Sequence, residues 1–425
     1  MERLFANALA RYVRKGDLTI QLPSGDVRCL GDGSPPSLAV AFRSRAVLRH
    51  MMADPSLGFA EGYMDGDITI EKGDLLDIFQ VAFTNGDYSG MTGSASRLRA
   101  GLNFLVRRFF QINTAARSRR NVRHHYDLSG DLYRLFLDPD LQYSCAYFEY
   151  PGQDLAEAQL AKKRHLAAKL CLEPGHSVLE IGSGWGGLAL YLARHLEAEV
   201  LGVTLSEEQL EVSRRRADEE GLSGRVRFEL QDYREVNRRF DRIVSVGMFE
   251  HVGVNHYKAY FDAIARLLKS DGVALVHTIG RSGPPTVTDS FIRKHIFPGG
   301  YIPALSEVAP VLERAGLVLT DLEVLRLHYA ETLKAWRANF LAAGDKVDAI
   351  YDKRFRRMWE CYLAASEAAF RWGDLCVFQF QLARTKSAVP LTRDYIPAAE
   401  DALRQKDSGR KRRRSRQKGI VTTAQ

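Results

Sequence analysis

Short apolar segments alternate with segments of helical periodicity between residues 159 and 278 of this 425-residue chain, and this alternation constrains the fold more than any other feature. Strand-like and helix-like segments of these lengths, following one another, predict a doubly wound, mostly parallel sheet with helices on both faces. The expected helices are 159–170, 187–195, 207–220 and 257–268, and the expected strands are 177–181, 199–204, 226–231, 242–246 and 272–278.

The first expected strand runs directly into a glycine-rich turn, Gly182-Ser183-Gly184-Trp185-Gly186-Gly187. Glycines let the backbone approach a ligand closely, and the following helix offers free N–H groups at its positive end. Ligands of such sheets bind beyond the carboxyl ends of the strands. The turn therefore predicts the adenosyl-cofactor loop of a methyltransferase; a turn that only packs a strand on a helix is the simpler alternative.

The glycine spacing alone leaves a dinucleotide cofactor open. Gly182, Gly184 and Gly187 also satisfy the pattern G-x-G-x-x-G, which calls for an acidic residue about 20 positions further on to bind the ribose. The next strand instead ends in Gly-Val-Thr-Leu-Ser at 202–206. This ending weakens the case for a nicotinamide dinucleotide.

Two further strand ends carry polar residues suited to chemistry. Glu250 follows the strand 242–246, and His277 lies at the end of the next expected strand. A nucleic-acid amino-methyltransferase would place an Asn-Pro-Pro-Tyr-like run after Val246, and this run is absent. Taken alone, His277 is more typical of a structural histidine, but its position beside Glu250 favours a functional pair.

The rest of the chain divides by composition. Residues 1–90 mix short strand and helix patterns, including helical patterns at 45–52 and 75–83, which predicts a small α+β domain. Residues 91–124 show no strand signal and form an expected helical linker. Its arginine-flanked helix 98–112 is either a solvated linker or an element lying on an anionic membrane. Residues 125–390 form the expected main domain.

The net charge and the cysteine content limit the remaining possibilities for partners, metal sites and cellular compartment. Seven of the eight excess positive charges lie within Arg410–Lys418, so the segment 391–425 is expected to be a basic, disordered tail that touches anionic lipid or nucleic acid or is simply solvated. The five scattered cysteines contain no Cys-x-x-Cys, so neither disulfides nor a metal site is expected. We find no signal peptide and no apolar run of about 18 residues, and therefore expect an intracellular, cytoplasmic protein.

Several longer motifs together carry a family resemblance. They are His-Tyr-Asp-Leu-Ser (125–129), Tyr-Ser-Cys-Ala-Tyr-Phe (143–148), Glu-Ile-Gly-Ser-Gly-Trp-Gly-Gly (180–187), Gly-Val-Thr-Leu-Ser-Glu-Glu-Gln (202–209), Phe-Glu-His-Val-Gly (249–253), Phe-Ile-Arg-Lys-His-Ile-Phe-Pro-Gly-Gly-Tyr-Ile-Pro (291–303) and His-Tyr-Ala-Glu-Thr-Leu-Lys-Ala-Trp (328–336). In this order and spacing, the chain resembles cyclopropane-fatty-acyl-phospholipid synthases and mycolic acid cyclopropane synthases over roughly residues 120–390. Its amino-terminal part resembles the phospholipid-acting members through Glu-Gly-Tyr-Met-Asp-Gly at 61–66.

The resemblance implies a Rossmann-like α/β methyltransferase fold that uses S-adenosylmethionine (SAM), with a smaller N-terminal α+β domain. It implies methyl transfer to a cis double bond of an unsaturated phospholipid acyl chain, followed by proton loss to bound bicarbonate and ring closure. Methylation or methylenation without ring closure is the alternative. The protein would then contact the cytoplasmic face of the inner membrane peripherally. No nucleic-acid partner is expected, and a homodimer stays open.

The resemblance also assigns residues to the two halves of the site. The bicarbonate site is implied to use Cys145, Glu250, His277, Ile279 and Tyr329. The residues implied to bind SAM are Tyr143, Ser144, Val178, Glu180, Gly182, Gly184, Trp185, Gly186, Thr204, Leu205, Ser206, Gln209, Asp232 and Tyr233.

Overall fold

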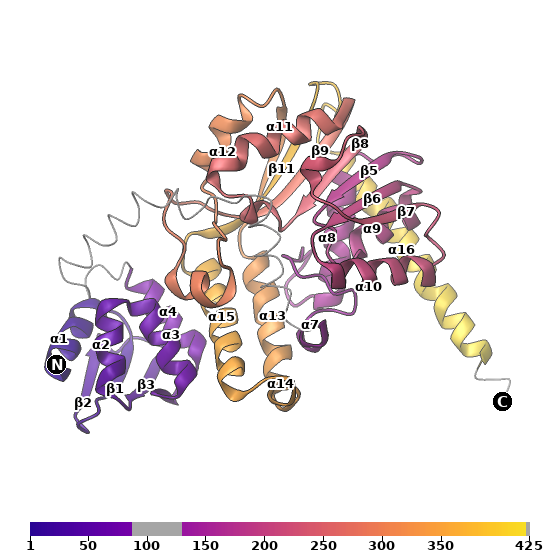
Figure 1. Ribbon diagram of the computed structural model, residues 1–425. Helices are drawn as coiled ribbons and strands as arrows, with labels where there is room; N and C mark the ends of the chain where they lie inside the picture. The colour runs from indigo at the N-terminus through magenta and orange to yellow at the C-terminus, as the bar shows by residue number, and fades with distance from the viewer. Residues whose placement is uncertain (87–129, 422–425) are drawn as a thin grey trace.

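The computed structural model describes residues 1–86 and 130–421, with side chains described up to residue 408. Figure 1 shows a small N-terminal domain beside a larger α/β part. The expected linker 91–124, its helix 98–112 and the motif at 125–129 lie outside the described residues. No helix within the described ranges is long and apolar enough to cross a membrane.

The N-terminal domain is α+β, as the sequence predicts. Its mixed sheet has the order β2-β1-β3-β4. The strands are β1 (Asp17–Gln21), β2 (Val27–Gly31), β3 (Ser37–Phe42) and β4 (Ile68–Lys72), and the helices are α1 (Glu2–Tyr12), α2 (Arg45–Ala53), α3 (Pro55–Asp65) and α4 (Leu75–Thr84).

The helix α3 occupies a segment rich in turn-forming residues. Asp54 caps its first turn by accepting a hydrogen bond from the Leu57 N–H at 3.1 Å, and Gly66 ends it in the left-handed region at φ 81°. Gly58 faces α2 so closely that a Cβ there would lie 2.5 Å from the Met51 nitrogen. This glycine therefore serves close helix packing rather than a turn.

The larger part is built on a seven-stranded sheet of order β10-β11-β9-β8-β5-β6-β7. The strands β5 to β9 are mutually parallel, whereas β11 is antiparallel to both of its neighbours. The strands are β5 (Ser177–Ile181), β6 (Glu199–Thr204), β7 (Val226–Leu230), β8 (Phe240–Val246), β9 (Leu268–Arg281), β10 (Val318–Leu325) and β11 (Leu375–Ala383). The predicted mostly parallel, doubly wound sheet is confirmed.

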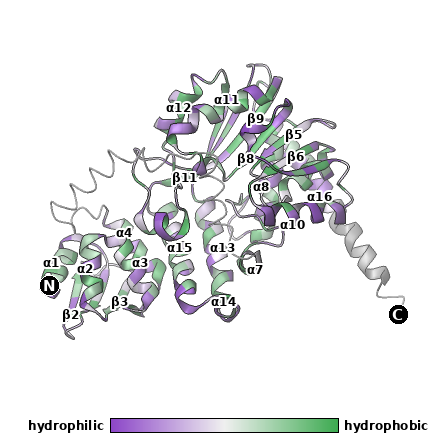
Figure 2. Ribbon diagram, viewed as in Figure 1, coloured by the Kyte–Doolittle hydropathy of each residue, from purple (hydrophilic) through white to green (hydrophobic). Residues whose placement is uncertain are grey.

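Helices cover both faces of this sheet (Figure 1). One face packs α8 (Leu155–Lys169), α9 (Gly187–Leu196) and α10 (Glu207–Glu219), and the other packs α11 (Tyr257–Leu267) and α12 (Leu305–Leu312). Figure 2 shows α10 as mostly hydrophilic, in keeping with its exposed outer side. The sheet thus separates two apolar cores and leaves its strand ends free for a site.

A third core, rich in aromatic residues, lies among α7, α13 and α15. These helices and α14 span α7 (Gly130–Phe136), α13 (His328–Ala342), α14 (Gly344–Ile350) and α15 (Lys353–Arg371). The helices α3 and α4 of the N-terminal domain pack on α15, where the Tyr63 hydroxyl donates to Glu360 at 2.9 Å. The aromatic core is therefore enclosed partly by the N-terminal domain.

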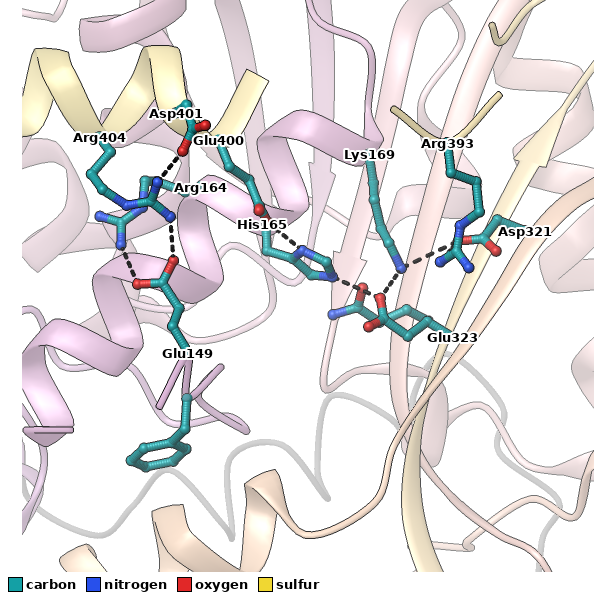
Figure 3. Close-up of polar contacts among 12 residues, drawn as sticks. Glu149, Arg164, His165, Lys169, Asp321, Glu323, Arg393, Glu400, Asp401 and Arg404 are labelled. Carbon is teal, nitrogen blue, oxygen red and sulfur yellow. Dashed lines mark hydrogen bonds and ion pairs between the residues drawn. The ribbon is translucent and has the colours of Figure 1, made fainter. Parts of the chain in front are cut away.

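The C-terminal segment differs from its prediction. Residues 391–425 are expected to be disordered, yet α16 (Tyr395–Val421) is helical, and its first half packs along α8 with Ile396 and Leu403 buried. Figure 3 shows the polar contacts that hold it: Glu400 bonds to His165, and Arg404 bonds to Glu149. Compensation of the buried charges on α8 explains why a polar segment folds here.

Candidate active site

A cavity opens at the carboxyl ends of β5, β6, β7 and β8. Most of the SAM residues implied by the sequence line it: Tyr143, Ser144, Glu180, Gly182, Gly184, Trp185, Thr204, Leu205, Gln209, Asp232 and Tyr233. Three others do not. Val178 is buried within β5, Gly186 caps the start of α9, and Ser206 caps α10 through the Gln209 N–H.

The glycine turn after β5 forms the floor of the cavity. Gly182 and Gly184 have φ angles of 79° and 52°, in the left-handed region that favours glycine. The N–H groups of Gly182 and Ser183 both bond to the Val203 carbonyl, at 2.9 and 3.0 Å. The turn is thereby fixed to β6, and its small residues keep the space above it open.

Glu180 supplies a buried acid to this cavity. One of its carboxylate oxygens has no hydrogen-bond partner in the described part of the chain. Burial raises the pKa of Glu180 to about 8, opposed by a backbone hydrogen bond from Ala189. An unpaired acidic oxygen beside an open glycine turn is suited to a cationic group, which fits the amino-acid end and the sulfonium of SAM.

The other end of the cavity lies at β6 and β7. The Thr204 hydroxyl donates to the Gln209 side-chain oxygen at 3.0 Å, which leaves the Gln209 amide nitrogen available as a donor. Asp232 is held by both nitrogen arms of Arg234, at 2.8 and 2.5 Å. These polar groups can bind the hydroxyls and ring nitrogens of an adenosine.

Glu250 and Ile279 meet at a second, deeper position. The Ile279 N–H at the end of β9 donates to one Glu250 oxygen at 2.6 Å, while the other oxygen has no partner among the described residues. Burial raises the pKa of Glu250 to about 7, and the bond from Ile279 opposes this shift. Glu250 is therefore close to half ionised at neutral pH.

His277 lies two residues before Ile279 on the same face of β9. Burial, aided by nearby cations such as Lys162, lowers the pKa of His277 to about 3, so the imidazole is neutral. Its Nδ1 accepts from the Gln379 amide at 3.2 Å, which places the proton on Nε2. His277 can thus donate one hydrogen bond but carries no charge.

Cys145 and Tyr329 are both buried in the aromatic core, against which Ile279 packs. Burial raises the pKa of the Cys145 thiol, and its sulfur donates to the Ala146 carbonyl at 3.2 Å. The Tyr329 ring lies 4.9 Å from Phe370 and 5.8 Å from Trp336. Of the five residues implied for the anion site, Glu250, His277 and Ile279 thus meet at the end of β9, whereas Cys145 and Tyr329 lie in the aromatic core; none of the five lines the cavity itself.

Several cavity residues are not among those that the sequence assigns to SAM, although His251 lies within the motif at 249–253. Gln142, Lys162, Met248 and His251 also line the cavity. Gln142 adjoins a motif that the sequence singles out, so extending that motif by one residue would find it. Lys162 lies within the run Lys-Lys-Arg-His on α8, which as sequence is typical of a solvated surface.

Comparison with known proteins gives consistent matches. The family described as mycolic acid cyclopropane synthetase matches residues 113–380, and a domain of unknown function matches residues 5–92. The cyclopropane-fatty-acyl-phospholipid synthase of Escherichia coli is 39% identical over 83% of this chain and 89% of its own length. The tuberculostearic acid methyltransferase of Mycobacterium tuberculosis is 35% identical over 89% of this chain and 91% of its own length.

A solved structure agrees with these sequence matches. The mycolic acid cyclopropane synthase CmaA1, solved with S-adenosylhomocysteine (SAH) and CTAB, is 36% identical, covers 62% of this chain and 98% of its own, and has a TM-score of 0.59.

Proposed function

Because the chain belongs to the mycolic acid cyclopropane synthetase family, and so is a SAM-dependent methyltransferase, we propose that it converts a cis double bond in a phospholipid acyl chain into a cyclopropane ring. The phospholipid substrate is supported by the E. coli relative, which matches across both parts of this chain. The single observation that carries the proposal is the buried Glu250–Ile279 pair with its unpartnered oxygen.

The first half of the reaction needs a methyl donor facing an apolar space. When bound, SAM supplies an electrophilic methyl group on a positively charged sulfur. Glu180 provides a carboxyl group that a bound cation would favour in its ionised form, the turn at 182–184 provides room, and Tyr143 and Ser144 close the cavity toward the aromatic core. The aromatic core against which Tyr143 packs would help to keep water from the reacting atoms.

The second half needs stabilisation of a carbocation. Tyr143 stacks on Trp336 at 5.2 Å, and the ring of Tyr329 meets Trp336 edge-on at 5.8 Å. The electron-rich faces of such rings attract a cation when water is excluded. This core therefore supplies the apolar environment for the acyl chain and the electrostatic environment for the charge that develops on it.

Proton removal completes the proposed reaction. An anion such as bicarbonate would accept the proton lost by the carbocation. The His277 Nε2–H is a donor for it, while the Ile279 N–H holds Glu250 in position. The ionised form of Glu250 can accept the hydroxyl proton of bicarbonate, and a pKa of about 7 keeps much of that form present at neutral pH.

The test uses purified protein, SAM and liposomes of monounsaturated phospholipid, followed by mass spectrometry of the fatty methyl esters. We expect a mass gain of one CH2 with loss of the alkene. An alkene retained beside a new methyl or methylene group would instead indicate methylation or methylenation without ring closure. The name of the M. tuberculosis relative, a methyltransferase, lends support to that alternative. Depleting dissolved CO2 should slow turnover, and added bicarbonate should restore it.

Peripheral membrane contact is part of the same proposal, since the substrate lies in a bilayer. The basic run at 410–418 can bind anionic lipid. Deleting residues 409–425 spares Lys406 and Asp407, which bond to α9 and α8. We expect this deletion to weaken binding to anionic vesicles at low salt and to leave SAH affinity intact; unchanged vesicle binding would remove the basic run from the membrane contact.

A further inference from the structure

Lys162 is a buried cation that forms no ion pair within the described part of the chain. Its side chain projects from α8 into the wall of the cavity, and only 1% of the residue is exposed. The ammonium donates to the Gln142 side-chain oxygen at 2.7 Å and to the Ser144 hydroxyl oxygen at 2.8 Å. A buried ammonium that bonds directly only to neutral groups is costly, and the carboxylates of Asp138 and Asp140 act on it only through space, so an anion bound in the cavity would stabilise it further.

The two hydrogen bonds orient the groups beside the cavity. An ammonium group donates and cannot accept, so the Ser144 oxygen must be the acceptor and its own O–H is free to donate elsewhere. Ser144 lines the cavity, and the space there is the direction left to its proton. Lys162 therefore turns the Ser144 hydroxyl into a hydrogen-bond donor toward a ligand.

The loop that carries Ser144 is held in place independently of Lys162. The Gln159 amide nitrogen donates to the carbonyls of Gln142 and Ser144, at 3.3 and 3.0 Å. Lys163 bonds to Asp140 at 2.5 Å on the outer side of the same loop. The loop thus has its own anchors on α8, and the charge of Lys162 is not needed simply to fasten it.

Lys162 lies near Glu180, and the two exert a direct electrostatic influence on each other. A carboxyl group and an amine thus lie together at the β5 end of the cavity. Arg234, at the β7 end, is already neutralised by its two-armed bond to Asp232. A ligand end that carries both a carboxylate and an ammonium group matches the Lys162–Glu180 end.

From this arrangement we propose that Lys162, acting through Ser144 and by its own charge, binds the carboxylate of the methionine portion of SAM. Glu180 faces the ammonium group of the same portion. Lys162 is in this assignment a determinant of cofactor affinity, and it selects ligands that carry a carboxylate.

The test compares two ligands that differ by that group alone. SAH carries the carboxylate, and S-adenosyl-3-thiopropylamine lacks it but keeps the amine. Calorimetry on the full-length protein should give tighter binding of SAH. In Lys162→Met, SAH affinity should fall roughly tenfold to a hundredfold while affinity for the amine changes by less than about twofold.

Two further variants decide between binding and mere anchoring. Lys163→Met removes a loop anchor outside the cavity and should leave the ratio of the two affinities unchanged. Ser144→Ala keeps the charge and should reduce that ratio in part, which also tests the proposal if Lys162→Met does not fold. Equal weakening of both ligands in Lys162→Met, or no weakening of either, would overturn the assignment.

Discussion

The Ile279 N–H and the Glu250 carboxylate are joined by a 2.6 Å hydrogen bond that links the end of β9 to the turn after β8. The second oxygen of Glu250 could accept a hydrogen bond as well, but it is buried and has no partner among the described residues. The protein therefore keeps an acid where it costs stability, which is typical of a group retained for function.

Replacing Glu250 with Gln should separate stability from turnover. Burial raises the pKa of Glu250 from 4.5 to about 7, so the wild-type protein loses stability as pH rises from 4.5 through 7. The amide cannot ionise, so the variant avoids this loss. The difference in the free energy of unfolding is up to about 3 kcal/mol above pH 7. We expect Glu250→Gln to melt higher than wild type at pH 8, to bind SAH normally and to lose turnover. Normal turnover would remove Glu250 from the proton-transfer site.

The profile of SAH affinity against pH should be bell-shaped. Burial raises the pKa of Glu180 to about 8 and lowers that of Lys162 to about 8. A zwitterionic ligand end needs the ionised acid and the charged amine together, so affinity should rise toward pH 8 and fall above it. Calorimetry from pH 6 to 10 measures both limbs. Glu180→Gln should lose the acidic limb, and in Lys162→Met the alkaline fall should begin at a higher pH, where the SAH amine itself loses its proton; a flat wild-type profile would contradict this.

His165 should make the packing of α16 sensitive to pH. Burial lowers the pKa of His165, but hydrogen bonds to Glu323 and Glu400, at 2.7 and 2.6 Å, outweigh it and raise the pKa above 6.5. This stabilisation is fully present below pH 6.5 and is lost as pH rises through the raised value. Melting temperatures at pH 6 and pH 9 should therefore differ less in His165→Gln than in wild type. The control is Lys258→Gln, in an exposed pair on α11.

Gly187→Ala should disturb cofactor binding without unfolding the protein. A Cβ at this position would lie 2.3 Å from the Gln142 amide nitrogen and 2.5 Å from an Asp140 oxygen, both held by lysines of α8. The loop must move, and we expect a loss of roughly 1–3 kcal/mol in SAH binding. Gly224→Ala is the control, because nothing lies within 4 Å of its Cβ. Unchanged SAH affinity in Gly187→Ala would show that the loop does not define the pocket.

The sequence predicts the parallel core of the fold well. The strands 177–181 and 199–204 are found with the predicted bounds, since strongly apolar runs between clear turns leave little choice. The strands β10 and β11 escape prediction because they lie outside the regular alternation of strands and helices at 159–278. The antiparallel pairing of β11 with β9, and of β10 with β11, depends on the rest of the sheet already being present.

Charge on α8 is the least predictable part of the site. Lys162 to His165 would be solvated in an isolated helix, and local sequence cannot reveal partners that lie far away in the chain. Glu323 and Glu400 reach His165 from 158 and 235 residues further on. For the same reason α16 is missed: its polar sequence suggests disorder until the face that it covers is known.

The contact between His165 and Glu400 also orders events during synthesis of the chain. At cellular rates of translation, 235 residues take roughly 10–50 s to add. Throughout that interval His165 lacks its Glu400 partner, although Glu323 and the strand and helix that follow α8 have already been synthesised. The nascent polypeptide thus acquires the outer wall of its cofactor domain after the inner one.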